Sequence, residues 1–192
     1  MSRKTKRVPI TLHPLSFDQL PSEEIRIILR GADDLIMSGG RTLLTRILKG
    51  SREKKILELE LDNSPAYGAF HDLTIEEVAE RIDWLIANNY LGIEYNYRLP
   101  LVIYRPRGWA IERETYANEL LEFLNILLAC PVTTTGIGWL NNNKSEVLIL
   151  LLDLFEASQY KKYLPVLAAW ATHASRRLAN RIHAVIGVLR SN

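Results

Sequence analysis

Apolar residues recur with the period of an α-helix along residues 41–49, which read RTLLTRILK. This spacing places one set of side chains on a single helical face: Leu43, Leu44, Ile47 and Leu48. Gly50 and Ser51 then interrupt the pattern, and the helix is expected to end there. A short helix is expected after this break, in REKKILELELD, with Ile56 and Leu59 pointing inward.

Two longer stretches show the same helical period. PSEEIRIILRGADDLI has Ser22 as a candidate N-cap and is expected to stop at Gly39 and Gly40. LTIEEVAERIDWLIANNYLG opens with Thr74 and Glu77 at the spacing of a capping box. Its expected buried face is formed by Ile75, Val78, Ile82, Leu85 and Ile86.

A hairpin is expected to follow the last of these helices. LGIEYNYRLPLVIYRP contains two β-prone runs on either side of residues 96–98. Three short helices, a further helix and a hairpin at its carboxyl end follow one another in the order of a winged helix-turn-helix. The predicted fold class is therefore mainly α, with a winged helix-turn-helix followed by an α-helical extension.

The chain is expected to divide into three regions: a basic arm or linker over residues 1–20, a winged-helix domain over 21–111, and an α-helical region over 112–192. The last region contains four helical stretches: TYANELLEFLNILLA, KSEVLILLLDLFEA, YLPVLAAWATHA and SRRLANRIHAVIGVLR. The polar connector PVTTTGIGWLNNN lies between the first two. They show no fixed repeat.

Composition is that of an ordinary globular protein, with 47% hydrophobic and 24% charged residues among 192. Net charge is only +2, but the cations are clustered. Residues 41–55 contain six cations against Glu53 alone, and no acid follows Glu156. The amino end adds Arg3, Lys4, Lys6 and Arg7. Such clusters form either a phosphate-binding face or the solvated face of a helix.

Cys130 is the single cysteine, which excludes an intrachain disulfide and a multi-cysteine zinc site within one chain. It ends an apolar helical stretch and is expected to be a buried, inert thiol. No signal peptide and no long uncharged apolar stretch are present, so we expect a soluble protein without membrane contact. The expected location is cytoplasmic, or the nucleoid in a bacterium.

No arrangement of residues indicates catalysis. The four histidines are scattered, and neither H-E-x-x-H nor G-x-S-x-G occurs. Adjacent acids such as Glu76 and Glu77 point in different directions on a helix, so they do not form an acid/base pair. We therefore predict no catalytic residue, no metal site, no cofactor and no enzymatic activity.

Residues 40–109 resemble the RQC domain, the winged-helix module of RecQ-type DNA helicases. The resemblance is carried by GGRTLLTRILKGS, the turn SPAYG, the long helix IEEVAERIDWLIANNYL and the hairpin. The phosphate loop G-x-x-x-x-G-K-[ST] of a helicase motor is absent, as are the cysteines of the zinc domain that precedes the module in the helicases. The chain looks like a stand-alone protein of the RQC-minor kind.

This resemblance implies that Lys49, Ser51 and Lys55 contact the DNA backbone. A helix beginning near Ser51 would offer unpaired N–H groups to a phosphate, next to Arg52 and Lys54. The alternative is that Ser51 is a simple N-cap and the lysines form a solvated face.

The resemblance also implies that an aromatic residue of the wing stacks on a terminal base pair, and Tyr97 is its counterpart here. Arg98 and Arg105 are candidates for phosphate contacts, and Arg107 is a further candidate. The alternative is that Tyr95 and Tyr97 cover the core edge of the hairpin. Arg177 and Arg181, four residues apart, could form a second DNA surface or a helix-packing contact.

The predicted function is that of a non-enzymatic DNA-binding protein acting at duplex ends, forks or junctions in replication, repair or recombination. An adaptor for a helicase or nuclease is the alternative, because LILLLDLF and VLAAW are more apolar than one core face requires. A transcriptional regulator is less favoured, since acids of the long helix would repel phosphate: Glu76, Glu77, Glu80 and Asp83. The oligomeric state stays open.

Overall fold

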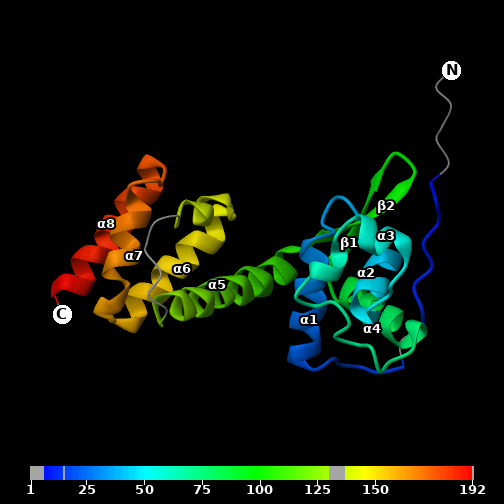
Figure 1. The fold of residues 1–192 in the computed structure, drawn as a ribbon. Helices are drawn as coiled ribbons and strands as arrows, with labels where there is room; N and C mark the ends of the chain where they lie inside the picture. Colours follow the sequence, from blue (N-terminus) through cyan, green and yellow to red (C-terminus); the bar gives the residue numbers. More distant parts are fainter. Residues whose placement is uncertain (1–6, 15, 130–136, 192) are drawn as a thin grey trace, which may run out of the picture. The chain divides into compact units, whose positions relative to one another are not determined.

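The computed structural model describes residues 7–14, 16–129 and 137–191 (Figure 1). The chain divides into two compact units, Met1–Glu112 and Arg113–Asn192. Cys130 and most of the predicted connector lie outside the described residues, so the structure says nothing of the expected buried thiol. Within the described residues, no helix is long and apolar enough to cross a membrane.

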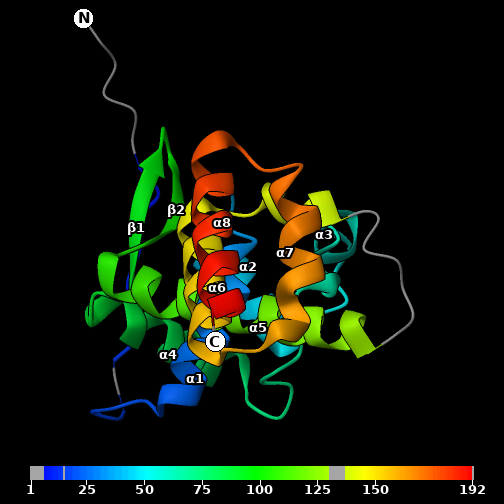
Figure 2. The same ribbon diagram turned by 90° about the vertical axis from the view of Figure 1, so that its left-hand side faces the viewer.

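The first unit is a winged helix, as predicted. Its helices precede an antiparallel hairpin in which Leu91 pairs with Tyr104 and Asn96 pairs with Leu99 (Figure 2). The elements in chain order are α1 (Ser22–Asp33), α2 (Arg41–Lys49), α3 (Lys54–Glu58), η1 (Leu61–Asn63), α4 (Ile75–Ala87), β1 (Leu91–Asn96) and β2 (Leu99–Tyr104). The segment before α2 also bonds β2, since Met37 N–H donates to Val102 O and Val102 N–H donates to Gly39 O.

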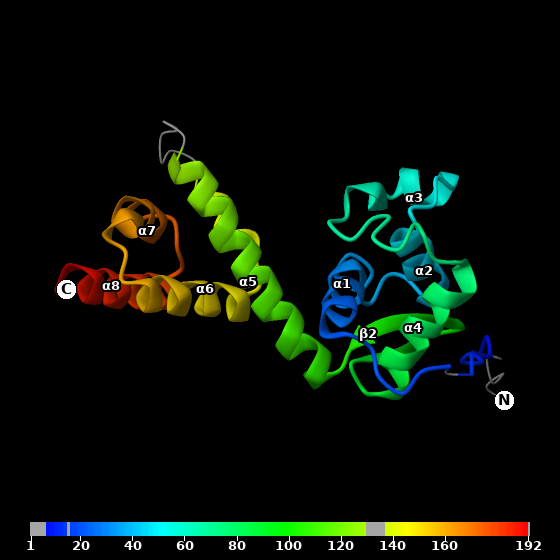
Figure 3. The same ribbon diagram turned by 90° about the horizontal axis from the view of Figure 1, so that it is seen from below.

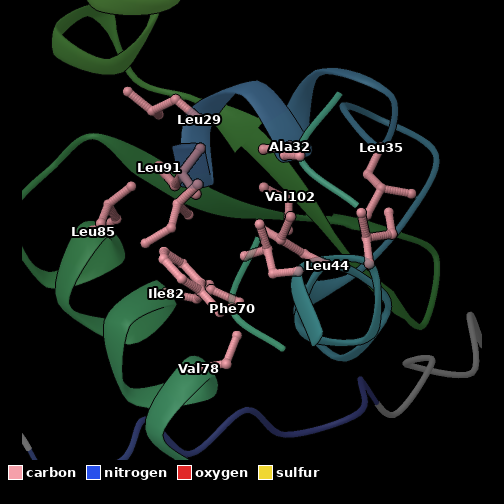
Figure 4. Close-up of a cluster of buried hydrophobic side chains, with 14 of the residues drawn as sticks. Leu29, Ala32, Leu35, Leu44, Phe70, Val78, Ile82, Leu85, Leu91 and Val102 are labelled. Atoms are coloured by element: carbon pink, nitrogen blue, oxygen red, sulfur yellow. The ribbon is translucent and has the colours of Figure 1, made fainter. Parts of the chain in front are cut away.

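The core of this unit lies between α1, α2, α4 and the hairpin. Figure 4 shows Leu29, Leu44, Ile82 and Val102 converging from these elements, and each is fully buried. The predicted apolar face of α2 is confirmed, because all four of its residues are buried. Burial of this set supplies the main driving force for folding of the unit.

Two residues expected in the core are exposed instead. Leu59 is 53% exposed because α3 ends at Glu58 and the chain then turns at Glu60, where φ is 53°. Ile75 is 55% exposed because it lies on the first turn of α4, at the edge of an open cleft between α2 and α4.

Helix boundaries differ from the sequence expectation at α1 and agree with it at α4. Pro21, not Ser22, occupies the N-cap of α1, and the helix ends at Asp33, before Gly39. The capping box of α4 is confirmed: Glu77 N–H donates to Thr74 Oγ1 at 3.2 Å, and Thr74 N–H donates to Glu77 Oε2 at 2.7 Å.

The second unit is helical throughout its described part. It contains the carboxyl part of α5 (Pro106–Ala129), then η2 (Ile137–Asn142), α6 (Ser145–Ser158), η3 (Lys161–Tyr163), α7 (Leu164–Ala171) and α8 (Arg176–Ser191), as Figure 3 shows. Its core is built around Phe155, Tyr163 and Trp170. The Trp170 indole N–H donates to Asn141 Oδ1 at 2.9 Å, so the buried ring keeps its polar atom satisfied.

The capping box makes the stability of α4 depend on pH. Hydrogen bonds from Thr74 lower the pKa of Glu77 below its usual value of 4.5. A depressed folded pKa contributes stability above the unfolded pKa, and this contribution is lost as pH falls through the folded value. We expect the difference in unfolding free energy between the wild type and Glu77→Gln to shrink as pH falls from neutral through the usual pKa of 4.5 and then through the lower folded value. Urea titrations at each pH measure it.

The matched control is Glu76→Gln, on the same turn but outside the capping box. The difference in unfolding free energy between the wild type and Glu76→Gln should not shrink in the same way as pH falls. A Glu77 carboxyl that titrates in the folded protein at its usual pKa, observed by NMR, would contradict the prediction.

Candidate nucleic-acid interface

The break after α2 is a closed helix end. Gly50 adopts a left-handed φ of 75°, and its N–H donates to Ile47 O at 2.9 Å. The Ser51 N–H donates to Arg46 O at 2.9 Å. These two bonds are the Schellman pattern, which satisfies carbonyls at the carboxyl end of a helix.

A second segment seals the same helix end. Gly68 N–H donates to Ile47 O and Phe70 N–H donates to Leu48 O, at 2.9 and 2.8 Å. A Cβ atom on Gly50 would lie 3.0 Å from the Gly68 Cα, so the two backbones approach too closely for a side chain. Tyr67 adds a bond from its hydroxyl to Ser51 O. The turn SPAYG therefore covers the carboxyl end of α2. This helix end and the residues after it, 49–55, are called the corner below.

The prediction that a helix begins near Ser51 is wrong. Helix α3 begins at Lys54, and Glu53 occupies its N-cap. The Ser51 N–H is already used by the Schellman turn, so it cannot serve as a free donor at a helix start. The Ser51 hydroxyl accepts from Glu53 N–H at 3.3 Å, and Glu53 pairs with Arg46 at 2.7 Å. The anion-binding helix start proposed from the sequence is thus absent at Ser51.

The predicted cations of the corner have different surroundings. The Lys49 ammonium donates to the carbonyls of His71 and Leu73, which fixes the loop before α4. Lys54 pairs with Glu58 at 3.3 Å, and both side chains are largely exposed. Arg52 and Lys55 are exposed and have no hydrogen-bonding or ionic partner among the described residues.

The tip of the hairpin is a two-residue turn formed by Tyr97 and Arg98. Tyr97 is 85% exposed and adopts a positive φ of 53°, as the first central residue of such a turn requires. This conformation costs a tyrosine about 1 to 3 kcal/mol, and the exposed ring regains none of it by packing. Tyr95 donates from its hydroxyl to Val8 O at 2.8 Å, so the two tyrosines do not share one role.

Arg98 and Arg105 lie at opposite ends of the hairpin. Arg98 belongs to the turn, and its carbonyl accepts from Val8 N–H at 3.1 Å. Arg105 follows β2 at the base, where its side chain lies over Gly92, and Arg107 lies beside it, 4.0 Å from the Tyr90 ring centroid. A strand of six residues spans about 17–20 Å. Arg105 therefore lies about one strand length away from Tyr97, and its phosphate contact stays a prediction.

The wing and the corner after α2 are two separate patches. The hairpin packs on the amino end of α2, where a Cβ on Gly40 would lie 2.8 Å from Pro100 O. Ser51 follows the carboxyl end of the same helix. Nine helical residues span about 13 Å, which corresponds to roughly four base-pair steps of duplex DNA.

The amino-terminal segment covers the middle of α4, whereas its first turn, with Glu76 and Glu77, is exposed. Asp83 is fully buried, and it accepts from His13 N–H and from Arg41 Nη1, each at 2.6 Å. The Trp84 indole N–H donates to Asp18 O at 3.1 Å. The open cleft of about 240 Å³ between α2 and α4 is bordered by Glu53 and Glu76. The exposed first turn of α4 therefore carries acidic side chains, which phosphate repels.

Arg181, a candidate for a second basic surface, belongs to the packing of the second unit. It donates to Asp153 at 2.7 Å and to Glu156 at 2.6 Å, and the bond to Asp153 raises its pKa. It therefore ties α8 to α6. Arg177 is exposed beside it and borders a cleft of about 790 Å³. Among the described residues, no cluster of three or more metal-ligating side chains occurs.

A helical bundle followed by a two-stranded wing, with an exposed aromatic at the wing tip, defines a winged-helix protein. The model of the RQC domain family matches residues 22–119, which is more than half of the chain. The chain therefore belongs to the RQC domain family, which confirms the resemblance. Comparisons with curated proteins and with solved structures gave no match. The RQC domain is a non-catalytic module, and membership suggests a DNA-binding or RecQ-related role.

The close approach of Gly50 and Gly68 predicts that Gly50→Ala destabilises the winged-helix unit. The left-handed conformation costs alanine about 1–2 kcal/mol, and the contact with Gly68 adds to it. We expect the free energy of unfolding, measured with urea, to fall by on the order of 2 kcal/mol, because these two effects add. Gly187→Ala is the control, because nothing lies within 4 Å of its Cβ position and the site is helical. Gly187→Ala should raise the free energy of unfolding by up to about 1 kcal/mol, because alanine favours the helix. Equal effects of the two substitutions would contradict the close approach.

Proposed function

We propose that this protein is a non-enzymatic DNA-binding protein that contacts the DNA backbone through its RQC winged helix. Its expected targets are duplex ends, forks or junctions. The observation that carries the proposal is Tyr97, an 85% exposed aromatic ring at the tip of the wing, held in a strained conformation without packing.

An exposed ring at a wing tip suits a DNA end better than the interior of a duplex. Stacking on a base contributes about 1 to 3 kcal/mol and has little sequence preference. A base presents its face only where the stack ends or opens. Tyr97 therefore favours a shape of DNA, and Arg98 beside it supplies a cation for the adjacent phosphate.

The corner after α2 would contact phosphates a few steps away from the end. Arg52 and Lys55 supply the exposed charges, and the Lys49 ammonium keeps a third donor beyond its two carbonyl bonds. Ser51 adds its hydroxyl. Lys54 can exchange its exposed partner for a phosphate at small cost, because such surface ion pairs contribute little. Arg105, at the base of the hairpin, is a further proposed phosphate contact, about one strand length from Tyr97.

Sequence-specific regulation is not favoured, because the exposed first turn of α4 carries Glu76 and Glu77, and the middle of the helix is covered. Backbone contacts position a protein without reading sequence. The sequence has no phosphate loop, and a helicase or other repair protein is the proposed partner for strand opening. Action in replication, repair or recombination, in the cytoplasm or nucleoid, is part of the proposal.

A role as an adaptor is the second candidate. Phe123 and Ile126 are 47% and 58% exposed on α5, three residues apart and on the same side of the helix. Exposed apolar neighbours are typical of contact surfaces. A purified candidate helicase or nuclease should then bind the wild type and not Phe123→Asp/Ile126→Asp. A wild-type protein that is a monodisperse monomer and binds neither the helicase nor the nuclease would contradict this role.

The primary test is fluorescence anisotropy with forked, blunt, single-stranded and covalently closed DNA at several salt concentrations. We expect forked and blunt DNA to bind more tightly than closed duplex. With about four to six phosphates neutralised, the slope of log affinity against log salt should be near −4 to −5. Equal affinity for ended and closed duplexes would contradict the wing proposal.

Tyr97→Ala should weaken binding to forked and blunt DNA by about 5- to 150-fold, the equivalent of one lost stacking contact, and should leave closed duplex unaffected. Tyr160→Ala is the control, because Tyr160 is also an exposed tyrosine, at 60%, in the other unit.

Arg52→Gln/Lys55→Gln should weaken binding to every DNA and reduce the magnitude of the salt slope by about 2. The control is Arg26→Gln, an exposed cation of α1. An unchanged slope in the double variant would remove the corner from the interface.

A further inference from the structure

The outward face of α8 is a row of polar and basic side chains. Arg176, Asn180, His183, Gly187 and Arg190 recur every three or four residues, and all are exposed. At 3.6 residues per turn these positions lie within about 80° of one another around the helix, so they share one face. The opposite face holds the buried residues of α8 and packs against α6 and α7 (Figure 1). This row is called the α8 stripe below.

The cations of the stripe have no partner in the described part of the chain. The side chains of Arg176, His183 and Arg190 make no hydrogen bond, ion pair or ring contact with a described residue. The same is true of Arg177, which borders the stripe. All aspartates and glutamates of the sequence lie among the described residues, so no acidic side chain elsewhere neutralises the row.

Arg181 lies on the same helix and has different surroundings. Asp153 and Glu156 of α6 accept hydrogen bonds from its guanidinium. Packing of α8 on α6 therefore uses Arg181 and leaves the arginines of the stripe in solvent.

The first turn of α8 carries charge of the sign that a helix start disfavours. Helices α1, α4 and α6 each have one or two glutamates in their first turn. Helix α8 has Arg176 and Arg177 there and no acid. The helix dipole disfavours cations at this end. The stability of the helix therefore does not explain the two arginines.

A nucleic-acid backbone is the polyanion that fits this surface. From Arg176 to Arg190 the axis of α8 rises about 21 Å, which equals about six steps of 3.4 Å along one strand of a duplex. Arginine binds a phosphate through two parallel N–H groups. Gly187 has no side chain, and the space above it is open, so a backbone can lie close to the middle of the stripe.

A lipid surface fits the stripe less well. A helix that lies in a membrane interface buries large apolar side chains on its bound face. Among the described residues, none of the exposed large apolar side chains belongs to α8. The stripe therefore offers charge and hydrogen-bond donors without an apolar anchor.

We propose that the α8 stripe binds the backbone of a second duplex segment, so that one chain holds two segments of DNA. Arg176, Arg177 and Arg190 contact the phosphates, and Asn180 and His183 lie between them. The winged helix holds the first segment, and for that segment alone the inference rests on the proposed function. The two surfaces belong to different compact units, so each can be removed by substitution without the other.

The first test asks whether the protein captures two DNAs. Forked DNA is attached to beads, and retention of a fluorescent, covalently closed duplex is measured at low salt. We expect the wild type to retain the closed duplex and Arg176→Gln/Arg177→Gln/Arg190→Gln, called the stripe variant, to lose it. The stripe variant should bind forked DNA in solution like the wild type. Retention of the closed duplex by the stripe variant would overturn the inference, since a dimer of winged helices explains it.

The second test changes one charge at constant shape. Asn180→Asp places a carboxylate in the middle of the stripe and should reduce retention of the closed duplex. Asn180→Gln stays neutral and is the matched control. Equal retention by the two variants would contradict a phosphate contact at the stripe.

The third test separates binding from folding. Since the helix dipole disfavours both cations of the first turn, Arg176→Gln/Arg177→Gln should melt at or above the wild-type temperature in circular dichroism. The same variant should retain less closed duplex. A lower melting temperature with unchanged retention would assign the two arginines to stability and overturn the inference.

A chain without the winged-helix contacts separates this inference from the proposed function. Tyr97→Ala/Arg52→Gln/Lys55→Gln should still bind closed duplex at low salt. Adding the substitutions of the stripe variant should reduce the magnitude of the salt slope by up to about 3, one unit for each arginine. An unchanged slope would overturn the α8 inference and leave the winged-helix role standing.

The remaining outcomes decide between the two surfaces and between two polyanions. If the winged-helix substitutions leave all DNA binding unchanged while the stripe variant loses it, the proposed function fails and the α8 inference stands. If the wild type binds phosphatidylserine vesicles through the stripe and retains no closed duplex, the surface is a lipid contact and the inference is overturned.

Discussion

The carboxylate of Asp83 is the constraint on which the arrangement of the winged-helix unit depends. It lies on α4 with no exposure to solvent, and its charge is balanced by donors from two other elements. Arg41 reaches it from the start of α2, and His13 reaches it from the amino-terminal arm. Removing one partner of a buried charge typically costs about 3–5 kcal/mol, so these three segments are held together. The arm is therefore part of the domain that it covers.

Covering α4 changes what a winged helix can do. In a helix-turn-helix that reads sequence, side chains of the recognition helix meet base edges in the major groove. Here Asp83 and Trp84 of that helix bind the arm instead. The proposed DNA surfaces, the exposed tip of the wing and the corner after α2, lie outside this covered part of α4. Recognition of DNA shape, as proposed above, does not require the covered residues.

Features set by local sequence were predictable, and features set by tertiary contact were not. The bounds of α2, the capping box at Thr74 and the hairpin all follow from periodicity or from residues a few positions apart. The start of α3 does not, because the turn at Gly50 is closed by Gly68, far along the chain. The sequence suggested that Asp83 is an exposed acid. It is buried because His13 and Arg41, both distant in sequence, bond to it. The DNA-binding role came from the family resemblance, since net charge carried no such signal.

The surroundings of Lys49 show a structural role that is compatible with the proposed phosphate contact. Its ammonium bonds two carbonyls of the loop that leads into α4, and this fixes the carboxyl end of α2 against that loop. An ammonium has three donors, so one remains for a phosphate. These bonds already restrict the Lys49 side chain. A phosphate contact there would therefore cost little additional side-chain entropy. For the proposed phosphate contact, the fixed position of the Lys49 ammonium therefore matters more than the number of cations nearby.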